Sequence, residues 1–262
     1  MGVKTTITLQ EAQRLFPAFR LENLQATDDG VMDTTYLLDN YILKRYERDI
    51  LQKIDSDAYH LQTLHKAGLN VPTLLAQNKE WYLYKRLNGL LPKNIQLFHI
   101  QTLAQFMAKM HKVTQKMSGT SNFLENYSIT TILMPIKKEY YFYYKKLSSL
   151  KNFTMRNDGF IHGDIFVDNT LFYNRKIAVF DFIDGGSGSF TFDIAVALLS
   201  FNPHKRRLYT NIFLNTYNQH APKKIKLSAL ELEVTNAAKL YGLLRLDSSK
   251  NVKKAKLLEK FW

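Results

Sequence analysis

Short runs of apolar residues, separated by polar or turn-forming residues, mark the first third of the chain. The runs at 34–38, 41–44 and 81–84 are rich in aromatic, aliphatic and β-branched residues, which is typical of strands. Asp39-Asn40 has the composition of a turn between the first two runs, and 21–26 is a further strand-like segment. The pattern therefore predicts a small sheet in this region.

Two helices accompany these strands. A short helix is expected near 9–16, and a second one spans about 56–66 and ends at Gly68, with Pro72 beyond it. This pair of residues stops a helix because glycine adopts the left-handed conformation and proline cannot continue the hydrogen-bond ladder. Residues 1–84 are therefore predicted to form a small lobe of mixed strand and helix.

Beyond residue 89 the apolar spacing becomes helical. Ile100, Leu103, Ala104 and Met107 recur at i, i+3 and i+4, which predicts an amphipathic helix over 98–115. Further helices are expected at 137–147, 192–201, 206–218, 228–245 and 251–260, and two strands at 170–173 and 177–180.

The order of these elements predicts an α+β, bilobal fold. Its parts are a small β-rich N-terminal lobe at 1–84, a hinge at 85–89 and a larger, mainly helical C-terminal lobe at 90–262. The aromatic run 140–144 stands among lysines, and we expect a helix there to bury its aromatic rings in the core.

Composition narrows the class of protein. A chain of 262 residues with 45% hydrophobic content can bury a sizeable core. It has neither an apolar run long enough to cross a bilayer nor an apparent signal segment, so we expect a soluble, cytoplasmic protein without a membrane partner. The absence of cysteine excludes disulfides and thiolate metal sites. A monomer and a homodimer are both compatible with the sequence.

The chain is strongly basic, with 36 Lys or Arg against 23 Asp or Glu and a net charge of +13. Lysines concentrate only at 223–226 and 250–260, where a solvated helix face or loop explains them. No nucleic-acid recognition motif accompanies the charge, so we expect no nucleic-acid partner. A basic protein does suit a polyanionic small molecule such as ATP.

Three oxygen-bearing side chains follow one another late in the chain. The segment 161–172 reads I-H-G-D-I-F-V-D-N-T-L-F, and Asp181-Phe182 comes after the predicted hairpin. The spacing from Asp164 to Asn169 and on to Asp181 matches the kinase pattern H-R-D-x-x-x-x-N followed by D-F, with Gly163 in place of Arg. This pattern predicts phosphoryl transfer from a nucleotide.

Each of these residues has an expected role in that chemistry. Asp164 is the candidate catalytic base, which aligns an acceptor hydroxyl with the γ-phosphorus. Asn169 and Asp181 offer the hard oxygen ligands that Mg²⁺ prefers. His162 is expected to satisfy backbone groups of the loop, and Asp193 to cap a helix or bond to the catalytic-loop backbone.

The small lobe offers candidates for nucleotide binding. Lys44 ends a predicted strand, from which a lysine reaches the α- and β-phosphates if an acid holds it, and Asp57 is the best-placed acid. Gly30 and Thr34 belong to a segment that either folds over the phosphates or forms an ordinary β-turn.

The hinge completes the set of nucleotide contacts. We expect the backbone of Tyr84–Leu87, with Lys85 and Leu87 as contact residues, to donate to and accept from the adenine base, because a hinge strand has unpaired edges. The glycine-rich stretch 185–189 is expected to be a flexible loop on the substrate side.

Taken together, these motifs resemble the aminoglycoside phosphotransferase and choline kinase superfamily, and within it the homoserine kinases built on that fold. The segments that carry the resemblance are 161–172, Asp181-Phe182 through Asp193-Ile194-Ala195, the turn and strand 30–38, Gly68–Pro72, and Ala237-Ala238 with Arg245-Leu246. The resemblance covers most of the chain. It implies a protein-kinase-like fold, ATP with Mg²⁺, Asp164 as base, Asn169 and Asp181 at the metal, and Lys44 on the phosphates.

The acceptor is expected to be a small molecule with a hydroxyl group. Beyond Pro222 there are ten Lys or Arg against four Asp or Glu, which disfavours a polycationic aminoglycoside. Choline or ethanolamine stays open because an aromatic cage could use the tyrosine-rich segment 140–144. An amino-acid alcohol needs a cation for its carboxylate and an acid for its amine, which Arg245 and Asp184 could supply, so homoserine is the leading choice.

A different class of function is also compatible with the sequence. A non-catalytic pseudokinase would bind nucleotide without transferring phosphate. The joint presence of Lys44, Asp164, Asn169 and Asp181 favours the enzyme.

Overall fold

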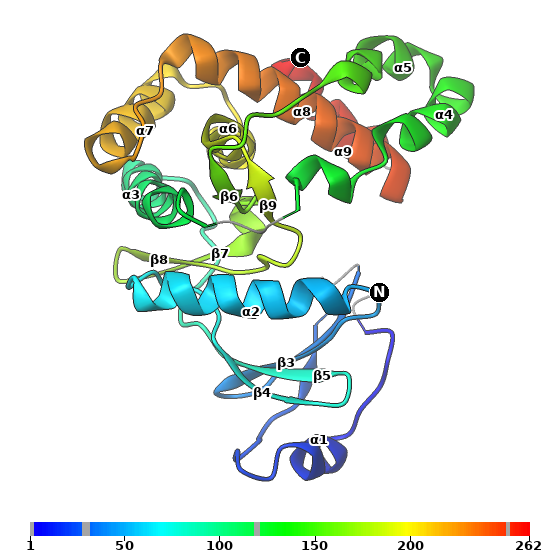
Figure 1. The fold of residues 1–262 in the computed structure, drawn as a ribbon, viewed down its shortest axis with the longest axis vertical. Coiled ribbons are helices and arrows are strands. Elements are labelled where there is room, and N and C mark those ends of the chain that lie inside the picture. The colour runs from blue at the N-terminus through cyan, green and yellow to red at the C-terminus, as the bar shows by residue number, and fades with distance from the viewer. Residues whose placement is uncertain (1–2, 28–31, 118–120, 250–251) are drawn as a thin grey trace. The chain divides into compact units, whose positions relative to one another are not determined.

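The structure is a computed structural model and describes residues 3–27, 32–117, 121–249 and 252–262. The chain divides into two compact units (Figure 1). The first comprises Met1–Gly89 together with Ala178–Ile183, and the second comprises Leu90–Ile177 and Asp184–Trp262. The Asp181-Phe182 pair therefore belongs to the first unit, although it follows the catalytic-loop motif in sequence. The boundaries proposed from sequence for the lobes and the hinge stay a prediction.

The first unit is built on one antiparallel sheet of five strands, in the order β1-β2-β3-β5-β4. The strands are β1 (Gln25–Ala26), β2 (Thr34–Leu37), β3 (Tyr41–Arg45), β4 (Leu74–Asn78) and β5 (Trp81–Lys85). The predicted strands at 34–38, 41–44 and 81–84 are confirmed to within one residue.

Side-chain alternation gives this sheet two different faces. Tyr36, Leu43 and Leu83 are buried in one core cluster with Ala12 of α1 (Leu9–Leu15). Successive side chains of a strand point to opposite faces, so Lys44, next to Leu43 on β3, leaves the sheet on the other side. The apolar pattern of β3 thereby sets the direction of its lysine.

Two elements of the first unit differ from the sequence-based expectation. Helix α2 runs from Leu51 to Lys66, five residues longer at its start than predicted. Strand β4 was not predicted, because its sequence LLAQN has no β-branched or aromatic residue and alternates only between half-buried and exposed positions. Pairing with β5 makes it a strand.

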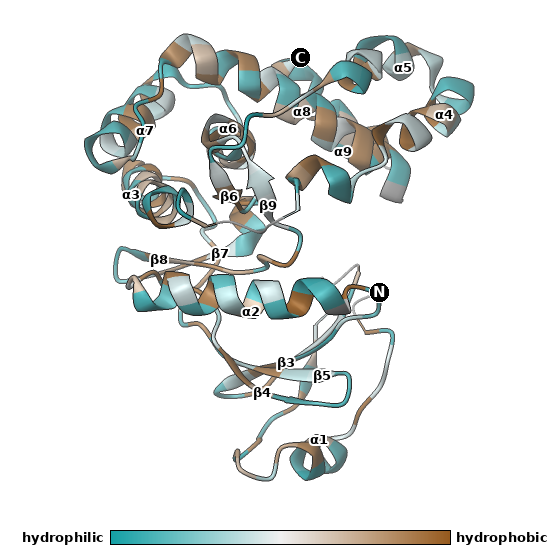
Figure 2. Ribbon diagram, viewed as in Figure 1, coloured by the Kyte–Doolittle hydropathy of each residue, from teal (hydrophilic) through white to brown (hydrophobic). Residues whose placement is uncertain are grey.

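The second unit is mainly helical. Its larger helices are α3 (Leu97–Thr114), α6 (Phe190–Phe201), α7 (Arg207–His220) and α8 (Leu227–Ser249). Helix α3 packs on α7, and α6 packs on α8. Apolar and polar segments alternate along α7 and α8 (Figure 2). In contrast, nearly every residue of α6 is buried, as expected for a helix that is apolar all round. The predicted α+β fold class is confirmed.

Short elements carry the motif residues. Strand β6 (Gly159–Ile161) pairs antiparallel with β9 (Gly186–Gly188), and β7 (Thr170–Tyr173) forms a two-stranded sheet with β8 (Lys176–Val179). The expectation of a flexible loop at 185–189 was wrong for its central residues, because Gly186–Gly188 form strand β9. A Cβ atom on Gly186 would lie 2.8 Å from the backbone of Phe123, so glycine serves close packing at this position rather than mobility.

The predicted helix at 137–147 is also corrected. Two helices, α4 (Ile129–Glu139) and α5 (Tyr141–Leu147), meet at Tyr140, whose φ of −138° lies outside the helical range. Of the aromatic run expected in the core, Tyr141 is 55% exposed and Phe142 is 63% exposed. Lysines of the same segment lie over these rings, an arrangement that stabilises exposed aromatic side chains.

The last helical segment, predicted at 251–260, consists of α9 (Val252–Lys256) and a short 3₁₀ turn (Glu259–Phe261). Among the residues that the structure describes, no helix is both long enough and apolar enough to traverse a bilayer.

Candidate active site

The catalytic-loop motif begins where β6 ends and continues into a 3₁₀ turn at Val167–Asn169. The Asn169 side-chain amide donates to the Asp164 carboxylate oxygen Oδ2 at 2.9 Å and to the Asp164 carbonyl at 2.8 Å. The Asp164 amide in turn donates to Nδ1 of His162 at 3.1 Å. The structure thus brings the predicted base and one predicted metal ligand together, and His162 satisfies a backbone group as expected.

Gly163 takes a conformation that other residues disfavour. Its φ is +75°, in the left-handed region, and a Cβ atom at this position would overlap the ring of Phe123. Glycine therefore permits both the turn and the close approach of Phe123 to the loop. The direction in which the chain enters Asp164 depends on this turn.

A buried carboxylate holds the loop from the side of α6. The Asp193 carboxylate accepts from the Gly163 amide at 2.7 Å and from the His162 amide at 3.4 Å. Of the two roles predicted for Asp193, the bond to the catalytic-loop backbone is confirmed. Both Asp193 and His111 are fully buried, and Nε2 of His111 lies 3.0 Å from Oδ2 of Asp193.

The network continues into α7. Nδ1 of His111 lies 2.8 Å from the hydroxyl of Tyr217, so a neutral imidazole can donate to Asp193 and accept from Tyr217. The His111 ring stacks on Phe190 with ring centroids 4.1 Å apart. Burial, followed by the charge of Asp193, raises the pKa of Tyr217, which therefore stays a protonated donor.

Helix α8 contributes two further side chains to the loop. The Tyr241 hydroxyl donates to the Gly163 carbonyl, and the Tyr241 ring packs edge-on against Phe166. One turn later, the Arg245 guanidinium lies 5.5 Å from the centre of the Phe166 ring. Tyr241 was missed in the sequence analysis, and its i, i+4 spacing from Arg245 was the signal that could have indicated it.

Arg245 is half-buried and electrostatically coupled to the loop. Burial lowers the pKa of Arg245, while the nearby carboxylates of Asp168 and Asp164 act in the opposite direction. Its Nη1 also donates to the Lys254 carbonyl at 3.3 Å. The predicted substrate residue therefore lies on the side of the loop that carries the candidate base. The other one, Asp184, is half-buried and its carbonyl accepts from Asn126 at 2.7 Å.

In the first unit, Lys44 forms an ion pair with Asp181, with Nζ 2.8 Å from Oδ1. The Lys44 Nζ also lies 4.9 Å from the centre of the Tyr46 ring. Burial disfavours the charged lysine, but Asp181, with smaller contributions from Asp33 and Tyr84, outweighs this effect, so the pKa of Lys44 is raised. Asp181 has a φ of +70°, a strained backbone conformation of the kind that functional sites often retain.

The other residues of this unit that were predicted to bind nucleotide contact protein groups. Thr34 is fully buried, and its hydroxyl donates to Glu47 at 2.6 Å and accepts from the Thr5 amide at 3.0 Å. Asp57 is buried, and its charge influences the hydroxyls of Tyr46 and Tyr84. Gly30 lies outside the described residues.

The two predicted hinge residues, Lys85 and Leu87, lie at and just beyond the end of β5. Lys85 ends β5, with an exposed side chain and an amide that donates to the Thr73 carbonyl at 2.9 Å. Leu87 follows in irregular backbone and is half-buried. The Lys85 amide is therefore used within the sheet.

The family assignment rests on a comparison with protein-family models. Residues 23–224 match the model described as the phosphotransferase enzyme family, which is most of the chain. The chain belongs to the phosphotransferase enzyme family. Its reaction class is therefore phosphoryl transfer.

Individual relatives of this phosphotransferase are distant. A homoserine kinase of Polaromonas naphthalenivorans (strain CJ2) is 22% identical over 228 residues, which cover 76% of this chain and 72% of that protein. Among solved structures, the amicoumacin kinase hAmiN in complex with AMP-PNP, Ca²⁺ and Ami has a TM-score of 0.68 at 17% identity, covering 95% of this chain and 93% of that one. The macrolide 2'-phosphotransferase MphH from Brachybacterium faecium has a TM-score of 0.66 at 16% identity, covering 96% of each chain. These similarities show that the phosphotransferase has the kinase-like fold.

The donor chemistry of the phosphotransferase fits a hard divalent cation. Asn169 uses its amide nitrogen to donate to Asp164, which leaves its Oδ1 as an acceptor, and the Asp181 side chain is 42% exposed. Within the described ranges, no three His, Cys, Asp or Glu side chains cluster as a protein-only metal site. Each of these side chains, taken by itself, offers a hard oxygen of the kind that Mg²⁺ prefers.

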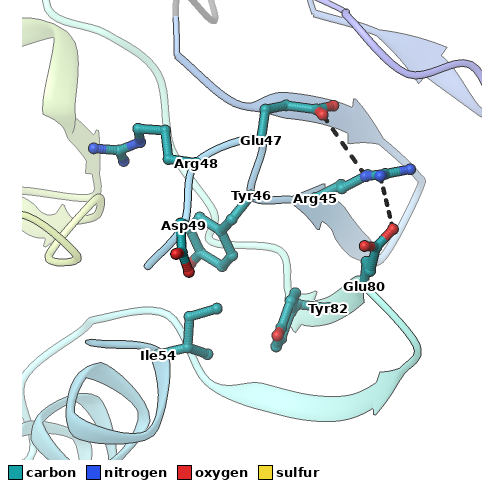
Figure 3. A pocket seen from close by; sticks show the side chains of 8 residues that line it. All are labelled: Arg45, Tyr46, Glu47, Arg48, Asp49, Ile54, Glu80 and Tyr82. Carbon is teal, nitrogen blue, oxygen red and sulfur yellow. Dashed lines mark ion pairs between the residues drawn. The ribbon is translucent and has the colours of Figure 1, made fainter. Parts of the chain in front are cut away.

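The first unit of the phosphotransferase also contains a pocket of about 250 Å³ that includes none of the predicted site residues (Figure 3). Figure 3 shows the Arg45 guanidinium between two acids, and its nitrogens lie 2.7 Å from Glu80 and 3.7 Å from Glu47. The other lining residues are Tyr46, Arg48, Asp49, Ile54 and Tyr82. The lining contains both arginines and acidic residues. The pocket therefore favours neither anionic nor cationic ligands.

Proposed function

We propose that this phosphotransferase is an ATP- and Mg²⁺-dependent kinase for the hydroxyl group of homoserine or a similar amino alcohol. The observation that carries the proposal is the contact between Asp164 and Asn169, with Oδ2 of the carboxylate 2.9 Å from the amide nitrogen. A carboxylate whose orientation is fixed in this way can accept a hydrogen bond from a substrate hydroxyl and align it for attack.

The acceptor side of the proposal begins with Asp164. One oxygen of its carboxylate is oriented by Asn169, and the loop backbone before it is held by Asp193. In this proposal the carboxylate receives the hydroxyl proton as the bond from the hydroxyl oxygen to the γ-phosphorus forms. The bond between the γ-phosphorus and the β,γ-bridging oxygen of ATP breaks, and ADP leaves with that electron pair. Positioning supplies most of the catalysis in such transfers, because the leaving and attacking oxygens must lie nearly in line.

The nucleotide side of the proposal rests on Lys44, Asn169 and Asp181. When bound, Mg²⁺ would neutralise the charge that develops on the transferred phosphoryl group. Asn169 and Asp181 are the proposed oxygen ligands, and Lys44 is the proposed partner of the α- and β-phosphates. The ion pair between Lys44 and Asp181 compensates both charges. Lys85 and Leu87 remain the proposed contacts of the adenine base, and Thr34 a proposed neighbour of the phosphates.

The choice of an amino alcohol rests on Arg245. Its guanidinium is half-buried beside the loop that carries Asp164, and burial lowers its pKa without removing its charge. A guanidinium in such a place can bind a carboxylate through two parallel hydrogen bonds. Choline, ethanolamine and aminoglycosides have no carboxylate group. Asp184 is the proposed partner of the substrate amine. The distant relative named homoserine kinase agrees with this choice.

A second candidate is a choline or ethanolamine kinase. Tyr141 and Phe142 are exposed rather than buried, so aromatic rings are available at the surface of the second unit. Quaternary ammonium groups bind to such rings. However, Lys145 and Lys146 already lie over these two rings, which opposes a further cation at the same faces.

A panel of acceptors tests the proposed function. Purified protein with MgATP is incubated with homoserine, choline, ethanolamine or kanamycin, and phosphorus NMR detects the phosphate ester. The expected result is O-phosphohomoserine. Phosphocholine or a phosphorylated aminoglycoside, with no product from homoserine, would replace the proposed acceptor. Tight nucleotide binding without transfer to any acceptor would support the pseudokinase instead.

The role of Arg245 is tested with a matched pair of variants. Arg245→Met should raise the KM for homoserine about 10- to 100-fold while the KM for ATP stays within about twofold, because a charge-assisted bidentate contact to the acceptor is lost. Arg156→Met is the control, since Arg156 belongs to the same unit, is 61% exposed and pairs with Asp158 at 3.5 Å. Equal effects of the two substitutions would contradict the role of Arg245.

A further inference from the structure

Tyr241 is a buried tyrosine whose polar end lies at the catalytic loop. It is 7% exposed, and its hydroxyl donates to the Gly163 carbonyl although the two residues are 78 positions apart. Its ring packs against Phe166 at a centroid distance of 4.8 Å and an interplanar angle of 73°. The side chain thus contacts the loop on both sides of Asp164, at Gly163 and at Phe166.

The bond from Tyr241 completes the fixation of one peptide segment. The Gly163 amide is already held by the Asp193 carboxylate at 2.7 Å, and Tyr241 takes the carbonyl of the same residue. Gly163 is the residue with a φ of +75° that turns the chain into Asp164. The Gly163 carbonyl belongs to the peptide plane that it shares with Asp164, so its orientation sets the direction from which the Asp164 side chain projects.

The Tyr241 hydroxyl is suited to this role because it keeps its proton. Burial raises the pKa of Tyr241 well above the usual value for a tyrosine, and the negative charge of Asp164 and a hydrogen bond with the Asp164 side chain raise it further. A deprotonated tyrosine would repel the carboxylate and lose the bond to the carbonyl. The raised pKa therefore favours the protonated hydroxyl, which is the form that donates to the Gly163 carbonyl.

The role would be unnecessary if packing alone fixed the loop. A phenylalanine at 241 would fill almost the same volume and keep the contact with Phe166, so the hydroxyl adds no packing. It does satisfy a buried carbonyl, and an unsatisfied carbonyl at this place would favour rotation of the peptide plane next to Asp164.

We propose that Tyr241 is a positioning residue of the phosphoryl transfer, which acts through the Gly163 carbonyl and through its contact with the Asp164 side chain to hold Asp164 in its productive orientation. The proposal rests on the proposed function, because it takes Asp164 as the base. Tyr241 itself does not touch the nucleotide or the acceptor in this account. Its removal should therefore change the rate of transfer and leave the binding of both substrates in place.

The test uses the full chain with Tyr241→Phe and the matched control Tyr209→Phe. Tyr209 also donates its hydroxyl to a backbone carbonyl of the second unit, that of Ile95 at 3.3 Å, and the hydrogen bonds of its side chain go to Arg206 and Ile95 rather than to the catalytic loop. Tyr241→Phe should lower kcat about 10- to 100-fold, with the KM for ATP and for the acceptor within about twofold of the wild type. Tyr209→Phe should keep both kcat and KM.

A second readout needs no activity. Amide hydrogen exchange is measured by mass spectrometry on each protein without ligand. The peptide that contains 162–169 should exchange faster in Tyr241→Phe than in the wild type. In Tyr209→Phe the exchange rate of this peptide should equal that of the wild type. If this peptide exchanges faster in Tyr241→Phe but the wild type phosphorylates none of the acceptors, the loop-positioning role of Tyr241 is supported and the proposed function is contradicted. A kcat within twofold of the wild type, unchanged exchange of this peptide, or an equal loss in Tyr209→Phe would overturn the role of Tyr241.

Discussion

Lys44 Nζ lies 2.8 Å from Asp181 Oδ1, so the lysine proposed for the nucleotide phosphates is paired with a carboxylate proposed for the metal. The two residues are 137 positions apart and both belong to the first unit. In this ion pair each charge compensates the other. Binding of MgATP would give Lys44 phosphate oxygens and Asp181 a cation, so neither charge is left unpaired at either stage.

The first prediction concerns Lys44. Lys44→Met should lower kcat/KM for ATP about 10- to 100-fold, because a charge-assisted contact to the phosphates is lost and Asp181 loses its partner. Steady-state kinetics at varied ATP concentration measures the change. Lys79→Met is the matched control, since Lys79 is an exposed lysine in the turn that follows β4. A Lys44 variant with the ATP kinetics of the wild type would remove this residue from the nucleotide site.

The second prediction concerns pH and stability. Burial lowers the pKa of His60 to about 4, from the ordinary value of 6.5, and the side chain is only 3% exposed. Between these two values the unfolded chain binds the proton better than the folded one. The contribution of a neutral His60 is therefore complete above pH 6.5 and is lost as the pH falls toward 4. At 1.36 kcal/mol per pKa unit, the loss from pH 7.5 to pH 5 is about 2 kcal/mol.

Urea unfolding at several pH values between 5 and 7.5 tests the role of His60. The variant His60→Leu should lose this part of the pH dependence, whatever its absolute stability. The control His65→Leu lies on the same helix with an exposed side chain and should keep the wild-type dependence. An unchanged pH dependence in His60→Leu would show that another group is responsible.

The third prediction concerns the buried network behind the catalytic loop. Asp193→Ala should lower the free energy of unfolding by about 3 kcal/mol, because His111 and the Gly163 amide lose a buried charged partner. Chemical denaturation measures the loss. In contrast, Glu22→Gln removes an exposed ion pair with Arg20 and should change stability by less than about 0.5 kcal/mol. Equal effects of both substitutions would contradict a structural role of the Asp193 network.

The parts of the site that the sequence predicted are local in the chain. Asp164 and Asn169 are five residues apart, and the turn that brings them together has a recognisable pattern of glycine, acid and amide. Asp193 was also within reach, because an acid in the first turn of an apolar helix has few partners other than backbone amides.

The parts that the sequence did not predict depend on distant contacts. Tyr241 stands in an apolar helical repeat, where its i, i+4 spacing from Arg245 puts it on the same helix face but does not show that its hydroxyl reaches Gly163. Asp57 was the expected partner of Lys44, whereas the ion pair in the structure is with Asp181. Glycines at 186 and 188 read as a flexible loop, although they allow β9 to lie close to Phe123 and Ile161.

The central claim is that the carboxylate of Asp164 carries the transfer. The most direct measurement is the rate of phosphate transfer in a single turnover with MgATP and homoserine, for the wild type, for Asp164→Asn and for Asp247→Asn, an exposed acid of the same unit. Loss of a general base typically lowers the rate 10²- to 10⁴-fold, so transfer by Asp164→Asn should be about 10³-fold slower than transfer by the wild type. Asp164→Asn should still bind a fluorescent ATP analogue as the wild type does. The control Asp247→Asn should be fully active. Transfer by Asp164→Asn at the rate of the wild type would contradict the account.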